Sequence, residues 1–178
     1  MERRDPISVK SYDPTWPESF ERERSGVERA LAPFAVGAVE HMGSTSVPGL
    51  DAKPIIDMVV PARSYRDGAA IVQALAAAGW THDPQPDDKE MRRHSFCKPD
   101  PAWRTHHLHV VEARTRPWRQ WLAFRDHLRA DPEAVREYAQ LKRCLAERHP
   151  YDREAYRAGK GEFVMKVLAR GDAARAVS

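Results

Sequence analysis

The sequence predicts an α/β chain of the α+β type, in which a mixed β-sheet with flanking helices is followed by a helical C-terminal third. Alternating or apolar runs typical of strands end near residue 112, whereas apolar residues recur at helical spacing from Trp118 onward. The 178 residues suffice for one domain with its own core. We expect that domain to span residues 7–170, with residues 1–6 and 171–178 as loose tails.

In the first two thirds of the chain, the hydrophobic patterns and cap residues predict five strands and two helices. Thr15 and Glu18 have the spacing of a capping box, so a helix is expected from there to about Leu31. A second, Ala-rich helix is expected over residues 65–79, where Gly79 ends it. The strand patterns occupy residues 7–12, 35–42, 54–60, 90–98 and 105–112.

The C-terminal third predicts three helices. Trp118 and Trp121 share a helical face, and we expect both in the core. Asp131, which precedes a proline, is predicted to cap the second helix. Asp152 is predicted to cap the third, which carries Tyr156 and Lys160 in line on one face.

Composition excludes several classes of protein. The formal charge of +3 leaves no dominant electrostatic field and does not favour nucleic-acid binding. No run approaches the roughly 20 apolar residues of a membrane span, and residues 1–6 do not begin a signal peptide. Cys97 and Cys144 have no CxxC spacing, so we expect a cytoplasmic protein with reduced thiols. The 22 Arg against 7 Lys are ascribed mainly to the base composition of the genome.

The most informative motif is a small-residue loop, residues 43–50, which follows His41 and Met42 and leads into an apolar strand containing Asp57. Glycines and hydroxyls that lie close together offer the backbone amides and O–H donors that bind phosphate. A carboxylate within an apolar run is costly unless it is paired, hydrated or metal-bound. The alternative is a tight strand–loop connection in which Asp57 caps a turn or pairs an arginine. The phosphate-binding candidates here are His41, Gly43, Ser44, Thr45, Ser46 and Lys53.

These residues resemble the signature of the GrpB family. The resemblance rests on residues 41–50 with residues 53–57, and continues in 12–14, 16–17, 107–111 and 124–126, and in Tyr156 with Lys160. It covers roughly residues 8–170. The resemblance implies a nucleotidyltransferase-like fold. A domain of this kind also occurs fused to dephospho-CoA kinase in some bacteria, which implies a link to the CoA pathway.

The superfamily pattern to which the resemblance points is a Gly-Ser pair followed on the next strand by two carboxylates separated by one apolar residue. Gly43-Ser44 is followed by 12 residues and then by Asp57. Val59 occupies the second acidic position, or Ile55 the first, so one acid of the pair is missing. Such carboxylates hold the Mg²⁺ ions that neutralise a triphosphate, so two-metal catalysis requires a ligand from another strand.

A second strand offers such ligands. Alternation places His107 and His109 on one face and Glu112 on the other. Glu112 is the available acid and is taken with Asp57 as a candidate metal ligand, for Mg²⁺ or alternatively Mn²⁺ or Zn²⁺. A zinc site needs three or four ligands, so it would require further histidines such as His41. The alternative is that the two histidines are polar side chains that line a cleft or face water.

A cationic face is expected on the preceding strand, where Arg92, His94, Phe96 and Lys98 alternate with the core. Such a face suits a nucleotide, and the alternative is an ordinary solvated surface. Lys160 either reaches a cleft or covers the core with its stem.

Two functions follow from these residues. The first is transfer of a nucleotidyl group with Mg²⁺, with Asp57, His107 and His109 catalytic and Arg92, Lys53 and Lys160 neutralising the substrate. The second is a degenerate module that binds a nucleotide, a CoA-like ligand or another phosphorylated small molecule without transfer. A zinc-dependent hydrolase is a third reading.

Overall fold

The computed structural model describes residues 6–176, without the side chains of residues 116–117 and 171–176. The first part of the chain contains α1 (Trp16–Leu31), β1 (Glu40–Met42), η1 (Ser44–Ser46), β2 (Ile56–Ala62), η2 (Tyr65–Asp67), α2 (Gly68–Ala77), β3 (Thr81–His82), β4 (Arg93–Asp100) and β5 (Trp103–Glu112). The remainder contains α3 (Arg116–Ala130), α4 (Pro132–Arg148), α5 (Arg153–Ala158) and α6 (Gly161–Ala176).

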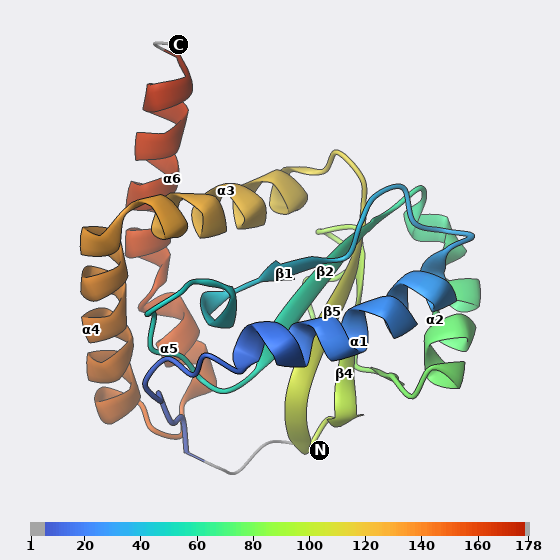
Figure 1. Ribbon diagram of the computed structural model, residues 1–178, viewed down its shortest axis with the longest axis horizontal. Helices are drawn as coiled ribbons and strands as arrows, with labels where there is room; N and C mark the ends of the chain where they lie inside the picture. The colour runs from blue at the N-terminus through green and yellow to red at the C-terminus, as the bar shows by residue number, and fades with distance from the viewer. Residues whose placement is uncertain (1–5, 177–178) are drawn as a thin grey trace.

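The predicted α+β class with a mixed sheet is confirmed. The described strands form one sheet in the order β1-β2-β5-β4-β3. Only β2 and β5 pair in parallel, and the other neighbours are antiparallel. Figure 1 shows α1 across the front of the sheet and helices α3 to α6 gathered beyond β1. The fold therefore separates a sheet with two helices from a helical C-terminal third.

The two faces of the sheet differ in chemistry. Met58, Leu108 and Phe96 belong to the main core, which packs against α1 and α2. The other face has apolar residues at one end, where Val59 and Val111 meet the partly buried Trp118 and Trp121 of α3. Residues of β2 are apolar on both faces because helices cover both, which explains its near-continuous apolar run. Asp57 interrupts that run on the second face.

The helical third builds its own core against the loop that precedes β2. Val47 and Leu50 of this loop pack with Leu128 of α3 and Tyr138 of α4. The buried Tyr156 of α5 packs with Ile7 and Leu145. The loop is thus held between the sheet and the C-terminal helices, so its geometry depends on both.

Several predicted boundaries are wrong. Residues 7–12 form no strand beyond an isolated bridge from Lys10 to Ala52, and the expected strand 35–42 shortens to β1 with a bridge from Ala35 to Ala62. Apart from β1 and these two bridges, the residues of both segments lie outside the sheet and connect other elements. The last helix is interrupted between α5 and α6, at Gly159 and Lys160. Helix α6 continues to Ala176, past the expected start of a tail, in an Ala- and Arg-rich stretch with high helix propensity.

The predicted capping box at Thr15 is also wrong. The Thr15 backbone is already helical and its side chain caps nothing in α1; instead its N–H and hydroxyl both donate to Asp13. Asp131 and Asp152 cap as predicted, since their carboxylates accept backbone N–H bonds at the starts of α4 and α5. Within residues 6–176, no helix has the length and apolar character needed to traverse a bilayer.

The two caps give a direct test of these assignments. Replacing Asp131 by Ala removes the acceptor for the amides of Glu133 and Ala134, so we expect a loss of about 1 kcal/mol in the free energy of unfolding. Thr15→Ala, which removes no helix cap, is expected to cost less than about 0.5 kcal/mol. Urea denaturation of both variants measures the difference, and equal losses would contradict the assignment.

Candidate functional site

Asp57 and His107 meet where the two parallel strands pair. They are direct register partners on β2 and β5, and His107 Nδ1 lies 3.0 Å from Asp57 Oδ1. Their side chains are 28% and 24% exposed, so solvent reaches both. Burial acts to raise the pKa of Asp57, but the hydrogen bond and charge of His107 lower it below its usual value. Asp57 is therefore an ionised acceptor at neutral pH, and the imidazole donates Nδ1–H to it.

Gly43 fixes the loop against that carboxylate. Its φ of 71° and ψ of −173° lie in a region that other residues avoid. A Cβ atom there would lie 2.3 Å from Asp57 Oδ2, so no larger residue fits. The small-residue loop thus brings its backbone into contact with the Asp57 carboxylate, and Ser44 begins η1 directly beside it. Within residues 6–176 the Ser44 hydroxyl has no hydrogen-bond partner, and it is only partly buried.

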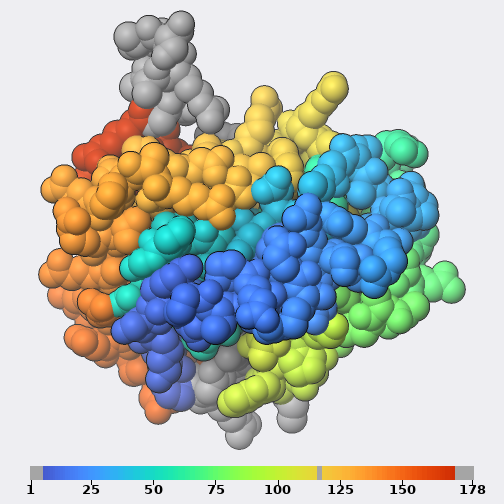
Figure 2. All heavy atoms as spheres, viewed as in Figure 1, coloured from blue at the N-terminus to red at the C-terminus, as the bar shows by residue number. Residues whose placement is uncertain are grey.

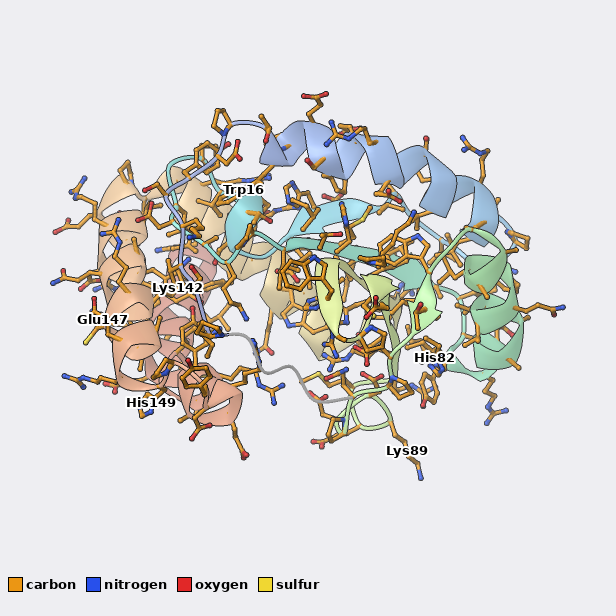
Figure 3. All side chains as sticks on the ribbon, turned by 90° about the horizontal axis from the view of Figure 1, so that it is seen from below. Trp16, His82, Lys89, Lys142, Glu147 and His149 are labelled. Carbon is orange, nitrogen blue, oxygen red and sulfur yellow. The ribbon has the colours of Figure 1, made fainter. Side chains whose placement is uncertain are left out.

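The C-terminal helices and the loop add three lysines and two tyrosines. The ammonium groups of Lys53 and Lys160 lie 5.4 and 4.7 Å from the centroid of the Tyr156 ring. Lys142 lies 4.7 Å from the centroid of the Tyr138 ring and donates to the backbone oxygen of Asp51. Figure 3 shows Lys142 on the inner side of α4, opposite to Glu147. We call the set of Asp57, His107, His109, Lys53, Lys142 and Lys160 the Asp57 site.

Burial lowers the pKa of two lysines of the Asp57 site, Lys142 and Lys160. Lys142 is only 2% exposed, and burial, with the charges of Lys160 and Lys53, lowers its pKa to about 7. Burial also lowers the pKa of Lys160, which the Asp57 charge opposes. Among the described residues neither Lys142 nor Lys160 has a carboxylate within ion-pair distance. Asp57 is thus the carboxylate whose field reaches both amines.

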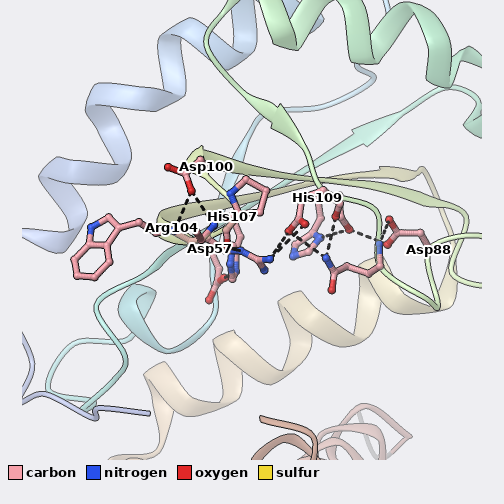
Figure 4. A network of polar contacts seen from close by, with 12 residues as sticks. Asp57, Asp88, Asp100, Arg104, His107 and His109 are labelled. Atoms are coloured by element: carbon pink, nitrogen blue, oxygen red, sulfur yellow. Dashed lines mark hydrogen bonds and ion pairs between the residues drawn. The ribbon is translucent and has the colours of Figure 1, made fainter. Parts of the chain in front are cut away.

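His109 is held by a chain of hydrogen bonds that runs through Ser95 of β4 to Asp88, in the segment before β4. Its Nδ1 lies 3.1 Å from Ser95 Oγ, and Ser95 Oγ donates to Asp88 Oδ1 at 2.8 Å. The buried Arg93 donates from Nε to the same Asp88 oxygen at 2.6 Å. Figure 4 draws Asp57, His107, His109 and Asp88 along one face of the sheet. Burial, with the charge of Arg93, lowers the pKa of His109 to about 3, so the ring is neutral.

Some predicted phosphate ligands are used within the fold instead. The Thr45 hydroxyl donates to the Ile55 carbonyl and contacts His41 Nε2 at 3.1 Å. His41 also stacks on Phe20, with ring centroids 4.8 Å apart, and burial lowers its pKa to about 4. The Ser46 hydroxyl donates to the Gly43 carbonyl at 2.6 Å. The structure therefore places these three side chains in the framework of the loop, while Gly43, Ser44 and Lys53 lie at the Asp57 site.

Arg92 and Glu112 are not brought to the Asp57 site. Both Glu112 oxygens accept from the Arg92 guanidinium, at 2.9 and 2.6 Å, and one also accepts from the Tyr65 amide. Glu112 pairs in register with Ala62, five positions along β2 from Asp57, roughly 16 Å away at 3.3 Å per residue. The expected grouping of Glu112 with Asp57 as metal ligands is wrong, because they lie at opposite ends of the sheet.

The donor set does not fit a two-metal centre. The second acidic position is occupied by Val59, which is fully buried. Over the part of the chain that the structure describes, no group of three or more His, Cys, Asp or Glu side chains converges as a metal site would require. His41 Nε2 is engaged with the Thr45 hydroxyl. The site supplies one carboxylate and several amines.

The expected cationic face of β4 is also corrected. Phe96 is buried in the main core, and Lys98 pairs with Glu23 of α1 at 2.8 Å. The His94 ring bonds the Tyr65 carbonyl at 2.9 Å. This face is covered by α1 and α2, whereas the chemistry of β4 lies on the opposite face, with Arg93 and Ser95.

Sequence reasoning missed Lys142, Tyr138 and Ser95 as parts of the site or its support, whereas Tyr156 and Arg93 were noted beside Lys160 and Arg92. Lys142 is at a position of α4 where the helical pattern would place an apolar residue, since Tyr138 and Leu145 are on the same face. A lysine on an apolar face is the signal that could have found it, as it did for Lys160. Ser95 gave no such signal, because its role depends on strand pairing.

A separate groove lies on the other side of the small-residue loop. It has a volume of about 510 Å³ and is lined by Tyr12, Pro17, His41, Ser46, Pro48, Gly49, Leu128, Arg129, Pro132 and Val135. Figure 2 shows this loop at the surface between the N-terminal segment and helices α3 and α4. Asp57, His107 and the lysines do not line it, so we do not identify the groove with the Asp57 site.

Comparisons with known proteins find relatives that match almost the whole chain. Residues 6–170 match the family model described as GrpB protein. A UPF0157 protein of Pseudomonas aeruginosa is 42% identical over 176 residues, which cover 96% of this chain and 69% of that protein. The crystal structure of the conserved protein GrpB from Enterococcus faecalis has a TM-score of 0.81 and 33% identity, with 92% of this chain and 96% of that chain covered. A dephospho-CoA kinase of Mycolicibacterium paratuberculosis is 31% identical over 94% of this chain, which spans 46% of that protein.

The contact between Gly43 and Asp57 predicts unequal effects of two glycine substitutions. Gly43→Ala combines an unfavourable backbone conformation with a clash against Asp57, so we expect it to cost at least about 2 kcal/mol. Gly49→Ala shares the positive φ, at 76°, but has no atom within 4 Å of the new Cβ. It is expected to cost about 1 kcal/mol. Urea denaturation measures both, and a smaller loss for Gly43→Ala would contradict the assigned contact.

Proposed function

The chain belongs to the GrpB family, and on that premise we propose that the Asp57 site binds a nucleotide or another phosphorylated small molecule. The observation that carries the proposal is the pair of buried or half-buried amines, Lys142 and Lys160, with no carboxylate of their own among the described residues. A buried amine without a counter-charge is unfavourable. The phosphate group of a ligand would supply this counter-charge, so ligand binding would offset the cost of burying the two amines.

The loop supports the same ligand. The hydroxyl of Ser44 is unpartnered within the described residues and lies next to Gly43, whose backbone contacts the Asp57 carboxylate. The amides that begin η1 have no acceptors within that turn, as at any helix start. Phosphate oxygens are acceptors only, so hydroxyl, amide and ammonium donors suit them together.

The geometry favours binding over nucleotidyl transfer. A two-ion mechanism needs carboxylates that Val59 and the distant Glu112 do not supply. Transfer remains the second candidate because Gly43-Ser44 and Asp57, the elements that the superfamily motif specifies, meet in space. In that case one Mg²⁺ would be held by Asp57 together with phosphate oxygens of the nucleotide, as Mg²⁺ sites with few protein ligands are.

A CoA-like ligand is one member of the proposed class. The relative from Mycolicibacterium paratuberculosis carries the name dephospho-CoA kinase, and this chain matches less than half of it. On that ground we include CoA and dephospho-CoA among the ligands to be tested. A role as a holding or accessory module for a partner enzyme follows if binding occurs without turnover.

Calorimetric titration tests the proposal. ATP, CoA and pyrophosphate are titrated into the wild-type protein with and without Mg²⁺, and we expect at least one to bind. Lys160→Met should then weaken binding roughly 10-fold or more, since a charged hydrogen bond contributes about 1.5–3 kcal/mol. Lys166→Met, on an exposed lysine of α6, is the matched control and should leave the affinity unchanged. No binding of any of these ligands would refute the proposal.

Asp57→Asn separates the two candidates. If the site only binds, affinity for the ligand survives the substitution, and no product forms from any nucleotide. If it transfers a nucleotidyl group, product formation by the wild type depends on Mg²⁺ and is abolished in Asp57→Asn, while thermal unfolding shows that the variant is folded.

Ligand binding should also take up protons near pH 8. The pKa of Lys142 lies at about 7 in the empty site, so most of this amine is neutral at pH 8. An anion nearby favours the charged form and raises that pKa, so the complex binds more protons than the free protein. Titration in buffers of different ionisation enthalpy measures the uptake. The uptake should fall as the pH rises above the pKa of the amine in the complex, and it should be absent in Lys142→Met.

A further inference from the structure

The hydrogen-bond chain on β4 fixes which nitrogen of His109 carries a proton. Asp88 is ionised, because hydrogen bonds from the Gln85 amide and Arg93 outweigh the effect of burial and lower its pKa. An ionised carboxylate only accepts, so the single proton of the Ser95 hydroxyl is donated to Asp88. Ser95 Oγ must then accept from His109, and Nδ1 of His109 carries the hydrogen.

The opposite nitrogen of His109 is therefore an acceptor. In a neutral imidazole, protonation at Nδ1 leaves a lone pair on Nε2. Among the described residues the His109 ring makes its hydrogen bond through Nδ1 and none through Nε2, and the ring shares the face of Asp57 and His107. The guanidinium of Arg93 lies near the same residues and disfavours a second proton on the ring. His109 thus presents a lone pair on the face of the sheet that carries Asp57. His107, whose Nδ1–H is donated to Asp57, has a second acceptor at Nε2, which is buried and has no partner within the described residues.

The doubly ionised phosphate group of a monoester has no hydrogen to donate to that lone pair. A ligand with a hydroxyl does, provided that the hydroxyl reaches the level of His109. His109 lies two residues along β5 from His107, the partner of Asp57, which corresponds to roughly 6–7 Å. A ligand that reaches from the level of Asp57 to His109 therefore needs its hydroxyl a few atoms away from its phosphate group.

We propose that the Asp57 site is specific for phosphate monoesters that carry a hydroxyl group, which donates its hydrogen to Nε2 of His109. The proposal rests on the proposed function, since the lysines must hold the phosphate. Ser95 and Asp88 are then positioning residues: they do not touch the ligand but fix the tautomer and orientation of His109. Arg93 completes this support by bonding Asp88 and lying 5.5 Å from the Trp121 ring centroid.

Three probes test the specificity: inorganic phosphate, propyl phosphate and glycerol 3-phosphate, each titrated into the full-length protein. Propyl phosphate and glycerol 3-phosphate differ by two hydroxyls alone. We expect glycerol 3-phosphate to bind roughly 3- to 10-fold more tightly, the effect of one neutral hydrogen bond. Equal affinities of these two esters would overturn the inference and leave the proposed function intact. Failure of all three to bind would overturn it too; binding of ATP, CoA or pyrophosphate would then still uphold the proposed function.

Variants assign the discrimination to His109. His109→Leu removes the acceptor and should bring the ratio of the two affinities to about 1. His109→Gln can place an amide oxygen near the position of Nε2 and should restore part of the ratio. Ser95→Ala should lower the ratio without changing the affinity for propyl phosphate, which also shows that the variant is folded. A ratio that is unchanged in His109→Leu would place the hydroxyl elsewhere and overturn the inference.

Discussion

The Asp57 carboxylate lies against the backbone of Gly43 and accepts a hydrogen bond from His107, and these two contacts set the geometry of the surrounding site. One joins β2 to the small-residue loop, and the other joins β2 to its only parallel neighbour, β5. A charged group within an otherwise apolar strand is tolerated because both contacts, and partial exposure, compensate for its desolvation. The loop conformation, the pairing of the strands and the charge of the site therefore depend on a single side chain.

The lysines come from a different part of the fold and have a different energetic role. Lys142 and Lys160 extend from the helical third toward the sheet, above tyrosine rings that bury their stems. Their amines are destabilised by burial, whereas Asp57 is stabilised in its ionised form. The helical third supplies positive charge at a cost to its own stability, and the sheet supplies fixed polar groups. This division suits a site in which a ligand, and not the protein, provides most of the negative charge.

Much of the fold could be predicted from the sequence, because hydrophobic period and cap residues are local signals. The buried strand β2, the Ala-rich helix α2 and the caps at Asp131 and Asp152 all follow from such signals. Residues 7–12 could not be assigned correctly, since their alternating pattern arises from contacts with residue 52 and the C-terminal helices rather than from a sheet. At the site, Asp57, His107 and Lys160 could be named from their unusual positions in apolar patterns. Their grouping, and the distance of Glu112, depend on register, which no local pattern contains.

The segment before α1 has a consequence for how the molecule assembles. The Ile7 amide donates to the carbonyl of Pro150, and Ile7 packs with Leu145 and Tyr156, so the beginning of the chain is secured by residues near its end. Lys160 follows Asp57 by more than a hundred residues in the sequence. During synthesis on the ribosome, the sheet can pair before the residues that complete the site have emerged. The proposed ligand site is therefore complete only after the last helices dock, and the ligand proposed for it would in turn link those helices to the sheet.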